Sequence, residues 1–311
     1  MPLPHWLSPD HKYLLGISGG RDSVYLLRWL LDRGVKDIIL CHLNHQLRGE
    51  ESQGDADFVK SLAEDLSLPS EIDSIDVRQL AQDQKLSLET AARDARHLFF
   101  LRCASEHNTS NILLAHHADD QAETILFRLL RGSAGAKGMH ERQIIRIGSE
   151  KLTLLRPLLE TRRSSISLHL KTRAIEFRED SSNAEPFATR NRLRNEALPL
   201  LEDIMSRDPT EALTRAARRT ADLEKIATET LSSTTLLDPQ GRIHLPSLRE
   251  ISPAMQRFAL RDFLKKSGIH ELSEELIENA LALADVNSPP SLNLPGGLRL
   301  RRKESRLFIS S

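Results

Sequence analysis

Six residues near the amino terminus have the types and the spacing of a phosphate-binding loop. They read Ser18-Gly19-Gly20-Arg21-Asp22-Ser23. Glycines let backbone N–H groups approach phosphate oxygens closely, and the start of a helix adds unpaired donors and a positive dipole. The two serines can add hydroxyl donors, whereas the carboxylate of Asp22 suits a metal ion or a cationic group. The pattern therefore predicts an anion-binding loop that carries one acidic residue.

The hydrophobic pattern on either side predicts the elements that position this loop. Residues 13–17 form an apolar run typical of a buried strand, and apolar residues recur at helical spacing through residues 24–31. A Walker A loop is excluded because no lysine occupies its required place. The dinucleotide-binding fingerprint is excluded because Gly16, Gly19 and Gly20 are wrongly spaced for it. The plain alternative is an ordinary strand-to-helix turn.

A second polar cluster follows another predicted strand. Residues 111–115 form an apolar run, and residues 116–124 then combine two histidines with Asp119, Asp120 and Glu123 at the start of a helix that extends through Leu130. Active sites of parallel sheets gather at the carboxyl ends of the strands, and carboxylates are the ligands that Mg²⁺ prefers beside ATP phosphates. Aspartate also caps helices, but both acids cannot be the cap. We therefore expect at least one of them to be free for chemistry.

A helix that begins after Ser87 offers two arginines to this region. Its expected apolar stripe consists of Leu88, Ala92, Ala95 and Phe99. Arg93 and Arg96 lie with Glu89 on a neighbouring face. Either these side chains form a surface ion-pair face, or one arginine points into the cleft and binds an ATP phosphate or a carboxylate substrate.

Histidines and cysteines near the second predicted strand, residues 37–43, raise the question of a metal. Cys41, His42 and His45 are metal-ligand types, but no fourth ligand has suitable spacing, so we do not expect a structural zinc. The alternative for His45 is a place near the adenine or the ribose of a nucleotide.

Composition and element order define the fold class. The chain has 311 residues with 39% hydrophobic and 28% charged side chains, enough for two domains. Strands that alternate with helices predict an α/β fold with a doubly wound parallel sheet, followed by a smaller, helix-rich domain. There is no apolar run of membrane-spanning length, no signal-peptide pattern and only two cysteines. We therefore expect a cytoplasmic protein without a membrane partner.

Eight segments together resemble one family. The loop at residues 18–23 resembles that of the N-type ATP pyrophosphatases, and the full set resembles the tRNA(Ile)-lysidine synthase family. The segments are SGGRDS (18–23), HLNHQLRG (42–49), ETAARDAR (89–96), AHHADDQAET (115–124), RGS (131–133), RPLL (156–159), EDSSN (179–183) and RNRLR (190–194). The chain resembles the short form of the family, which lacks an additional carboxyl-terminal domain.

The resemblance implies a fold, a reaction and its substrates. It implies an N-type ATP pyrophosphatase catalytic domain over residues 1–205, with an adenine nucleotide α-hydrolase-like sheet, and a tRNA-binding domain over residues 206–311. The reaction is an ATP-dependent ligation of L-lysine to C2 of the wobble cytidine of an isoleucine tRNA with a CAU anticodon. It passes through an adenylate, releases AMP and pyrophosphate, and uses Mg²⁺.

The resemblance also implies roles for particular residues. The expected catalytic residues are Asp22, Asp119 and Asp120, with Asp22 and Asp119 as metal ligands. The expected ATP-binding residues are Ser18, Gly19, Gly20, Arg21, Asp22, Ser23 and His45. The expected lysine-binding residues are Arg93, Arg96 and Asp120.

Clusters of arginine supply candidates for tRNA contacts, although the net charge of −1 argues against bulk nucleic-acid binding. The candidates are Arg190, Arg192, Arg194, Arg218, Arg219, Arg301 and Arg302. Their plain alternative is a solvated surface. A homodimer is left open, and two rivals to the ligase are a tRNA thiolase on the same scaffold and a catalytically silent tRNA-binding protein.

Overall fold

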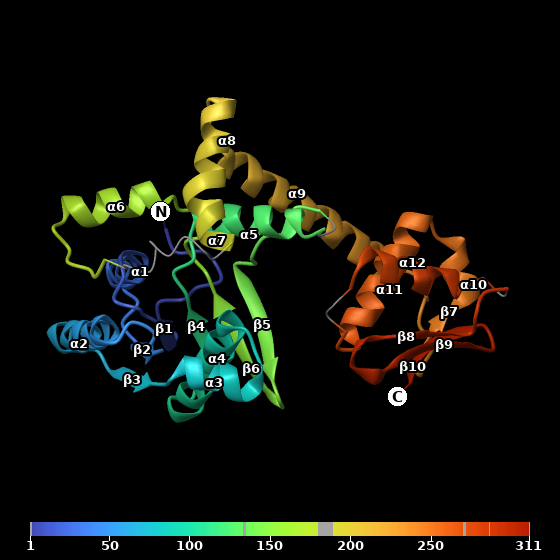
Figure 1. The fold of residues 1–311 in the computed structure, drawn as a ribbon, viewed down its shortest axis with the longest axis horizontal. Helices are drawn as coiled ribbons and strands as arrows, with labels where there is room; N and C mark the ends of the chain where they lie inside the picture. Colours follow the sequence, from blue (N-terminus) through green and yellow to red (C-terminus); the bar gives the residue numbers. More distant parts are fainter. Residues whose placement is uncertain (1, 133–134, 180–188, 270–271, 286, 311) are drawn as a thin grey trace. The chain divides into compact units, whose positions relative to one another are not determined.

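The chain forms two compact units (Figure 1). The computed structural model describes residues 2–132, 135–179, 189–269, 272–285 and 287–310. The first unit comprises residues 1–127 with 138–214, and the second comprises residues 128–137 with 215–311. The domain boundary predicted between residues 205 and 206 falls at the end of α8 (Leu198–Met205), and it stays a prediction.

The first unit is built on a six-stranded sheet of order β3-β2-β1-β4-β6-β5. All neighbouring strands pair in parallel except the last two, β6 and β5, which are antiparallel. The strands are β1 (Tyr13–Gly16), β2 (Ile38–Asn44), β3 (Ser70–Ser74), β4 (Asn111–Leu113), β5 (Arg142–Ile147) and β6 (Glu150–Leu155). This topology confirms the predicted doubly wound α/β class.

Helices cover both faces of this sheet because successive strand residues point to opposite sides. Leu15, Leu40 and Leu113 pack in one hydrophobic cluster with Trp29, whereas their strand neighbours pack in another cluster with Phe100. The helices of the first cluster are α1 (Arg21–Leu31), α2 (Glu50–Asp65) and α6 (Arg163–Thr172), and the second contains α4 (Leu88–Glu106). Two more helices, α3 (Val77–Gln84) and α5 (Ala118–Leu130), complete this part of the unit.

The helix predicted after Ser87 is α4, and its cap is as expected. The Ser87 side chain accepts a hydrogen bond from the Thr90 backbone N–H at 3.1 Å. The predicted apolar stripe was wrong at its start, because Leu88 is 41% exposed while Ala91 is fully buried. The helix therefore packs with a slightly different face toward the sheet than spacing alone indicated.

The β5–β6 hairpin was missed by the sequence analysis. All six side chains of β5 are exposed or only partly buried, so this edge strand lacks the apolar alternation that marks a half-buried strand. β6 adds a parallel partner to β4 and extends the sheet on that side.

A continuous helical segment closes the first unit. It consists of α7 (Thr189–Arg192), a π-helical turn (Leu193–Ala197) and α8. The sequence analysis did not predict the π turn. π turns are rare and often occur at functional sites. The long helix α9 (Pro209–Ser232) follows.

The second unit combines helices with an antiparallel sheet of order β7-β10-β9-β8. Its core brings Leu260 and Ile277 together with Leu300 and Leu307 of the sheet. The strands are β7 (Ile243–His244), β8 (Ser291–Asn293), β9 (Arg299–Lys303) and β10 (Arg306–Ser310), and the helices are α10 (Leu245–Glu250), α11 (Pro253–Lys266) and α12 (Glu274–Ala282). In the described parts of both units, no helix combines the length and apolar character needed to cross a bilayer.

Candidate active site

A cavity of about 600 Å³ opens at the carboxyl ends of β1, β2 and β4. This is where a parallel sheet places its ligands. The predicted phosphate loop lines one part of it through Ser18 and residues 20–23. Arg96 and Arg163 line it as well. The cavity therefore joins residues of six of the segments that the sequence analysis identified separately.

The phosphate loop is preformed by its own hydrogen bonds. The Ser23 hydroxyl donates to the Gly20 carbonyl at 2.9 Å and accepts the Ser18 backbone N–H at 3.2 Å. Gly19 has a φ of 81°, a left-handed conformation that favours glycine. Gly20 is the N-cap of α1. The backbone N–H groups of the first turn have no partner within the helix, and this turn lines the cavity.

An apolar part of the cavity lies beside the loop. Phe99, Phe100 and Leu114 line it, and His45 adds a ring with polar edges. Burial, reinforced by the positive charge of Arg96, lowers the pKa of His45 to about 4. His45 is therefore neutral near pH 7 and can face an uncharged base or sugar.

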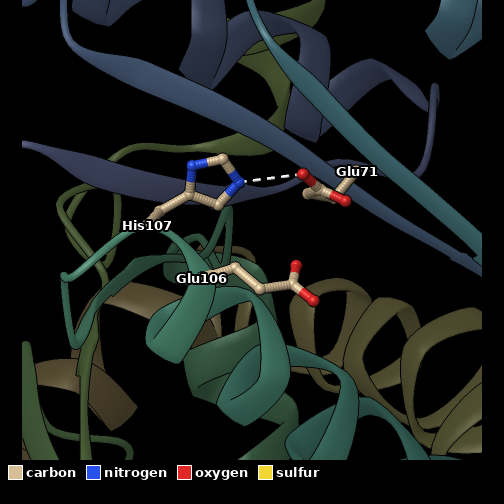
Figure 2. Close-up of side chains that lie close together, drawn as sticks. All are labelled: Glu71, Glu106 and His107. Carbon is tan, nitrogen blue, oxygen red and sulfur yellow. Dashed lines mark hydrogen bonds and ion pairs between the residues drawn. The ribbon is translucent and has the colours of Figure 1, made fainter.

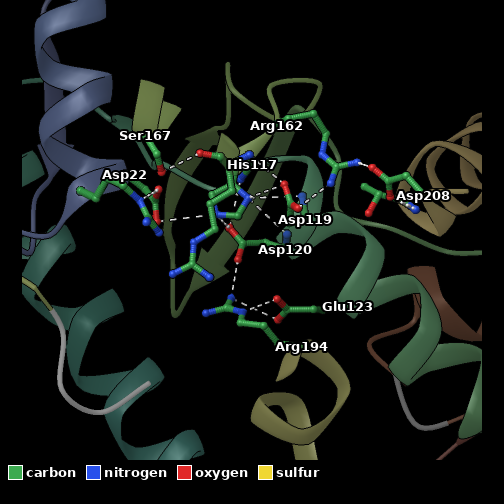
Figure 3. A network of polar contacts seen from close by, with 12 residues as sticks. Asp22, His117, Asp119, Asp120, Glu123, Arg162, Ser167, Arg194 and Asp208 are labelled. Atoms are coloured by element: carbon green, nitrogen blue, oxygen red, sulfur yellow. Dashed lines mark hydrogen bonds and ion pairs between the residues drawn. The ribbon is translucent and has the colours of Figure 1, made fainter. Parts of the chain in front are cut away.

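Three carboxylates surround a buried histidine at the polar end of the site (Figure 3). His117 is 1% exposed, and its Nε2 lies 3.5 Å from both Asp22 Oδ2 and Asp120 Oδ2. Its Nδ1 lies 3.6 Å from Asp119 Oδ2. Burial lowers the pKa of His117, but these carboxylates outweigh burial and raise the pKa to about 9. Nδ1 also accepts the backbone N–H groups of Asp119 and Asp120 at 3.2 and 3.4 Å, and these donors oppose protonation at that nitrogen.

The two adjacent acids of this cluster have different surroundings. Asp119 Oδ2 accepts the Arg163 backbone N–H at 2.9 Å, and this hydrogen bond caps α6. Asp119 Oδ1 accepts a hydrogen bond from Arg162 Nη2 at 2.9 Å. Burial acts to raise the pKa of Asp119, but His117, the Arg163 N–H and Arg162 lower it well below its usual range. Asp120 accepts the His117 backbone N–H through Oδ2 at 3.0 Å and Arg194 Nη2 through Oδ1 at 2.7 Å. Unlike Asp119, it lines the cavity together with Asp22. The tertiary structure thus distinguishes the acid that holds the framework from the acid that faces the ligand space.

Arg194 reaches this site from the π-helical turn. Its Nη2 donates to Asp120 Oδ1 at 2.7 Å and to Glu123 Oε2 at 3.2 Å. Burial raises the pKa of Glu123, and Arg194 partly offsets this. Arg194 was predicted among the tRNA contacts, yet it lies in the cavity wall. The sequence signal was only its regular spacing with two other arginines.

The two arginines of α4 lie in different environments. Arg96 lines the cavity, and its Nε is shielded from solvent without a hydrogen-bond partner among the described residues. Arg93 is 55% exposed and pairs with Asp94 at 3.7 Å. Of the two alternatives considered for this face, the cleft applies to Arg96 and the surface ion pair to Arg93.

The other predicted arginines lie outside this cavity wall. Arg192 is 65% exposed and pairs with Glu196 at 2.9 Å. Arg218 and Arg219 are exposed on α9, and Arg301 is exposed on β9. Arg302 is half-buried and donates to the Leu283 and Ser288 carbonyls at 2.9 and 2.8 Å. The side chain of Arg190 and residues 180–183 of the EDSSN segment lie outside the described residues.

A separate group of metal-ligand types lies at β3 and the end of α4 (Figure 2). Ligand atoms of Glu71, Glu106 and His107 lie within 4.8 Å of one another. Protein contacts already occupy them, since His107 Nε2 is 2.9 Å from Glu71 Oε1 and Arg102 is 3.8 Å from Glu106. We therefore assign this group no metal-binding role.

Two family models cover most of the chain. The PP-loop domain matches residues 4–201, and the TilS substrate binding domain matches residues 239–308. The chain therefore belongs to the PP-loop family, and the family-level resemblance noted from its motifs is confirmed.

Curated relatives of the chain carry the name tRNA(Ile)-lysidine synthase. The relative from Thermus thermophilus is 37% identical over 310 residues, which cover 97% of this chain and 57% of the relative. The relative from Geobacter sulfurreducens is 38% identical over 239 residues, covering 75% of this chain and 50% of the relative. The relative from Clostridioides difficile is 31% identical, and the match covers 96% of this chain and 66% of the relative. The chain thus spans between 50% and 66% of the length of these relatives.

A solved structure shares the fold. U34-tRNA thiolase NcsA from Methanococcus maripaludis, solved with its 4Fe-4S cluster, aligns with a TM-score of 0.53 and 15% identity. The alignment covers 68% of this chain and 72% of that chain. At this identity the likeness concerns the fold.

Proposed function

We propose that the chain ligates L-lysine to C2 of the wobble cytidine of an isoleucine tRNA, using ATP. The observation that carries this proposal is the single cavity in which a preformed phosphate loop, an apolar pocket and an acidic end meet. The names of the curated relatives support the same reaction. In the first step the cytidine C2 oxygen attacks the α-phosphorus of ATP and pyrophosphate leaves. In the second step the lysine ε-amine attacks C2 and AMP leaves.

The phosphate loop accounts for the first step by electrostatic stabilisation. Backbone N–H groups at the start of α1 and the Ser18 hydroxyl would bind the leaving pyrophosphate. Arg21 and Arg163 add positive charge to the same wall. The apolar pocket at Phe99 and Phe100, with neutral His45, is the proposed place of the adenosine.

Mg²⁺ fits the donor set at the acidic end. Asp22 and Asp120 present hard carboxylate oxygens to the cavity, and the contact with His117 keeps the pKa of Asp22 low despite burial. We propose Asp22 and Asp120 as the residues that hold the ion. Asp119, the second ligand predicted from the sequence, is not among the residues that line the cavity. The ion would neutralise charge on the leaving pyrophosphate.

The lysine substrate requires groups of both charges. Asp120 can bind its ammonium group and Arg96 can bind its carboxylate in a two-point geometry, since both line the cavity. Arg194 donates hydrogen bonds to both Asp120 and Glu123 and so fixes the positions of these two carboxylates. We propose that Arg96 rather than Arg93 takes this role, because only Arg96 of the two is found in the cavity wall.

The tRNA body needs a surface beyond the cavity. We propose the second unit, which matches the TilS substrate binding domain, with exposed Arg218, Arg219 and Arg301 as phosphate contacts. A target base splayed from its loop can then enter the cavity of the first unit. The cytoplasmic location of the protein and its assembly into a homodimer stay predictions.

Two assays test the reaction against its rivals. Wild-type protein should support tRNA-dependent exchange of labelled pyrophosphate into ATP, and it should attach labelled lysine to a tRNA transcript with a CAU anticodon. A transcript whose wobble cytidine is replaced by uridine is the matched control. Exchange without lysine attachment would overturn the ligase, and absence of both would favour the silent tRNA-binding protein. The thiolase rival is disfavoured because the only two cysteines, Cys41 and Cys103, are both buried.

A further inference from the structure

A segment that follows α6 pairs with the backbone of the phosphate loop. The Arg178 backbone N–H donates to the Gly19 carbonyl at 2.9 Å, and Arg178 forms a parallel β-bridge with Gly20. Arg178 is 123 residues from its side-chain partner Asp55, so this contact is tertiary. The backbone of the loop is thus attached to a distant segment at the two glycines that give it its shape.

The side chain of Arg178 is anchored on α2. Its Nε donates to Asp55 Oδ1 at 3.1 Å, and Arg48 Nη2 donates to Asp55 Oδ2 at 2.7 Å. The Asp55 side chain is 12% exposed, which makes it the buried centre of this arrangement. Gly54 leaves the space for the guanidinium, since a Cβ there would lie 3.0 Å from Arg178 Nη2.

The loop is therefore held between two elements. A Cβ at Gly19 would lie 3.1 Å from the Phe58 ring of α2 and 3.5 Å from Cγ of Arg178. The hydroxyl network of Ser18 and Ser23 shapes the loop from within. The Asp55–Arg178 pair attaches this segment to α2, and through the segment it attaches the loop.

We propose that Arg178 is a positioning residue for the phosphate loop and that Asp55 is its anchor. The pair holds the glycine backbone in the conformation that receives the β- and γ-phosphates of ATP. This inference rests on the proposed function, because it takes ATP as the ligand of the loop. It adds a role for two side chains outside the phosphate-binding motif itself.

The alternative is that Arg178, which lines the cavity, contributes its charge directly to the phosphates. The two roles respond differently to the loss of the anchor. Asp55→Asn keeps the charge of Arg178 but loosens its attachment, so positioning predicts weaker phosphate binding whereas a direct charge predicts no loss.

The experiment measures binding of ATP, pyrophosphate and adenosine to the full chain by calorimetry. We expect Arg178→Met and Asp55→Asn each to weaken ATP and pyrophosphate binding by about fivefold, the upper end for a partly exposed ion pair. Adenosine binding should not change. The double variant should be no weaker than the weaker single variant, because the two side chains act as one unit.

Arg173→Met is the matched control. Arg173 lies five positions earlier and pairs with Asp32 at 2.6 Å, and Asp32 is 38% exposed where Asp55 is 12% exposed. A purely structural effect would lower the unfolding temperature of this variant and of Arg178→Met alike, without changing phosphate affinity. The inference is overturned if Arg178→Met binds ATP as Arg173→Met does, or if Asp55→Asn binds ATP normally. Failure of the wild-type protein to bind ATP would instead overturn the proposed function.

Discussion

Replacing Asp119 with alanine separates a framework role from a metal-binding role. In the structure both oxygens of Asp119 accept hydrogen bonds, one from the Arg163 N–H that begins α6 and one from Arg162. Loss of a helix cap costs about 1 kcal/mol. Loss of a partly exposed ion pair, 24% and 34% exposed here, costs about a further 1 kcal/mol at most. We therefore expect Asp119→Ala to lower the free energy of unfolding by about 2 kcal/mol, the sum of these two contributions.

The assay can be restricted to the unit that contains the substitution. Both tryptophans, Trp6 and Trp29, belong to the first unit, and Trp29 is buried. Tryptophan fluorescence during urea unfolding therefore reports on this unit without a signal from the second. The change should appear as a lower urea midpoint with an unchanged slope.

Asp22→Ala is the matched comparison. Asp22 faces the cavity and makes one 3.5 Å contact with His117, so its loss should abolish pyrophosphate exchange and lower the urea midpoint less than Asp119→Ala does. Asp119→Ala should retain measurable exchange at low urea. Complete loss of exchange in Asp119→Ala with a wild-type urea midpoint would refute the framework role and restore Asp119 as a metal ligand.

Three further predictions concern other residues of the site and the second unit. Arg96→Met should raise the KM for lysine by about thirtyfold, equivalent to about 2 kcal/mol, with little change for ATP; Arg93→Met should change neither KM. The pKa of His45 is lowered from 6.5 to about 4, so the native state loses stability as the pH falls through this window. His45→Gln should flatten that dependence in urea titrations, and an unchanged curve would contradict it. Arg301→Ala should reduce the slope of log affinity against log salt by about 0.7 to 0.9 in filter binding to tRNA, whereas Arg302→Ala should chiefly destabilise the second unit, because it removes carbonyl contacts.

Local patterns were sufficient for the fold class and the phosphate loop. The alternation of apolar runs with helical spacing specified β1, α1, β2 and α4, because burial of one face or one strand leaves a periodic trace in the sequence. The β5–β6 hairpin left no such trace, since the β5 side chains stay exposed or only partly buried. Edge strands of this kind are stabilised by their pairing rather than by their own pattern.

The polar residues show the same difference between what the local sequence determines and what the tertiary structure determines. The sequence by itself determined which residues could bind phosphate or a cation, because residue type and a glycine turn are local properties. It could not determine that Asp119 caps α6, that Arg194 reaches Asp120 from 74 residues away, or that Asp55 anchors Arg178 from 123 residues away. These contacts exist only once the sheet and the π-helical turn have brought distant segments together. A charged side chain acquires its role from the charges that surround it in the folded chain.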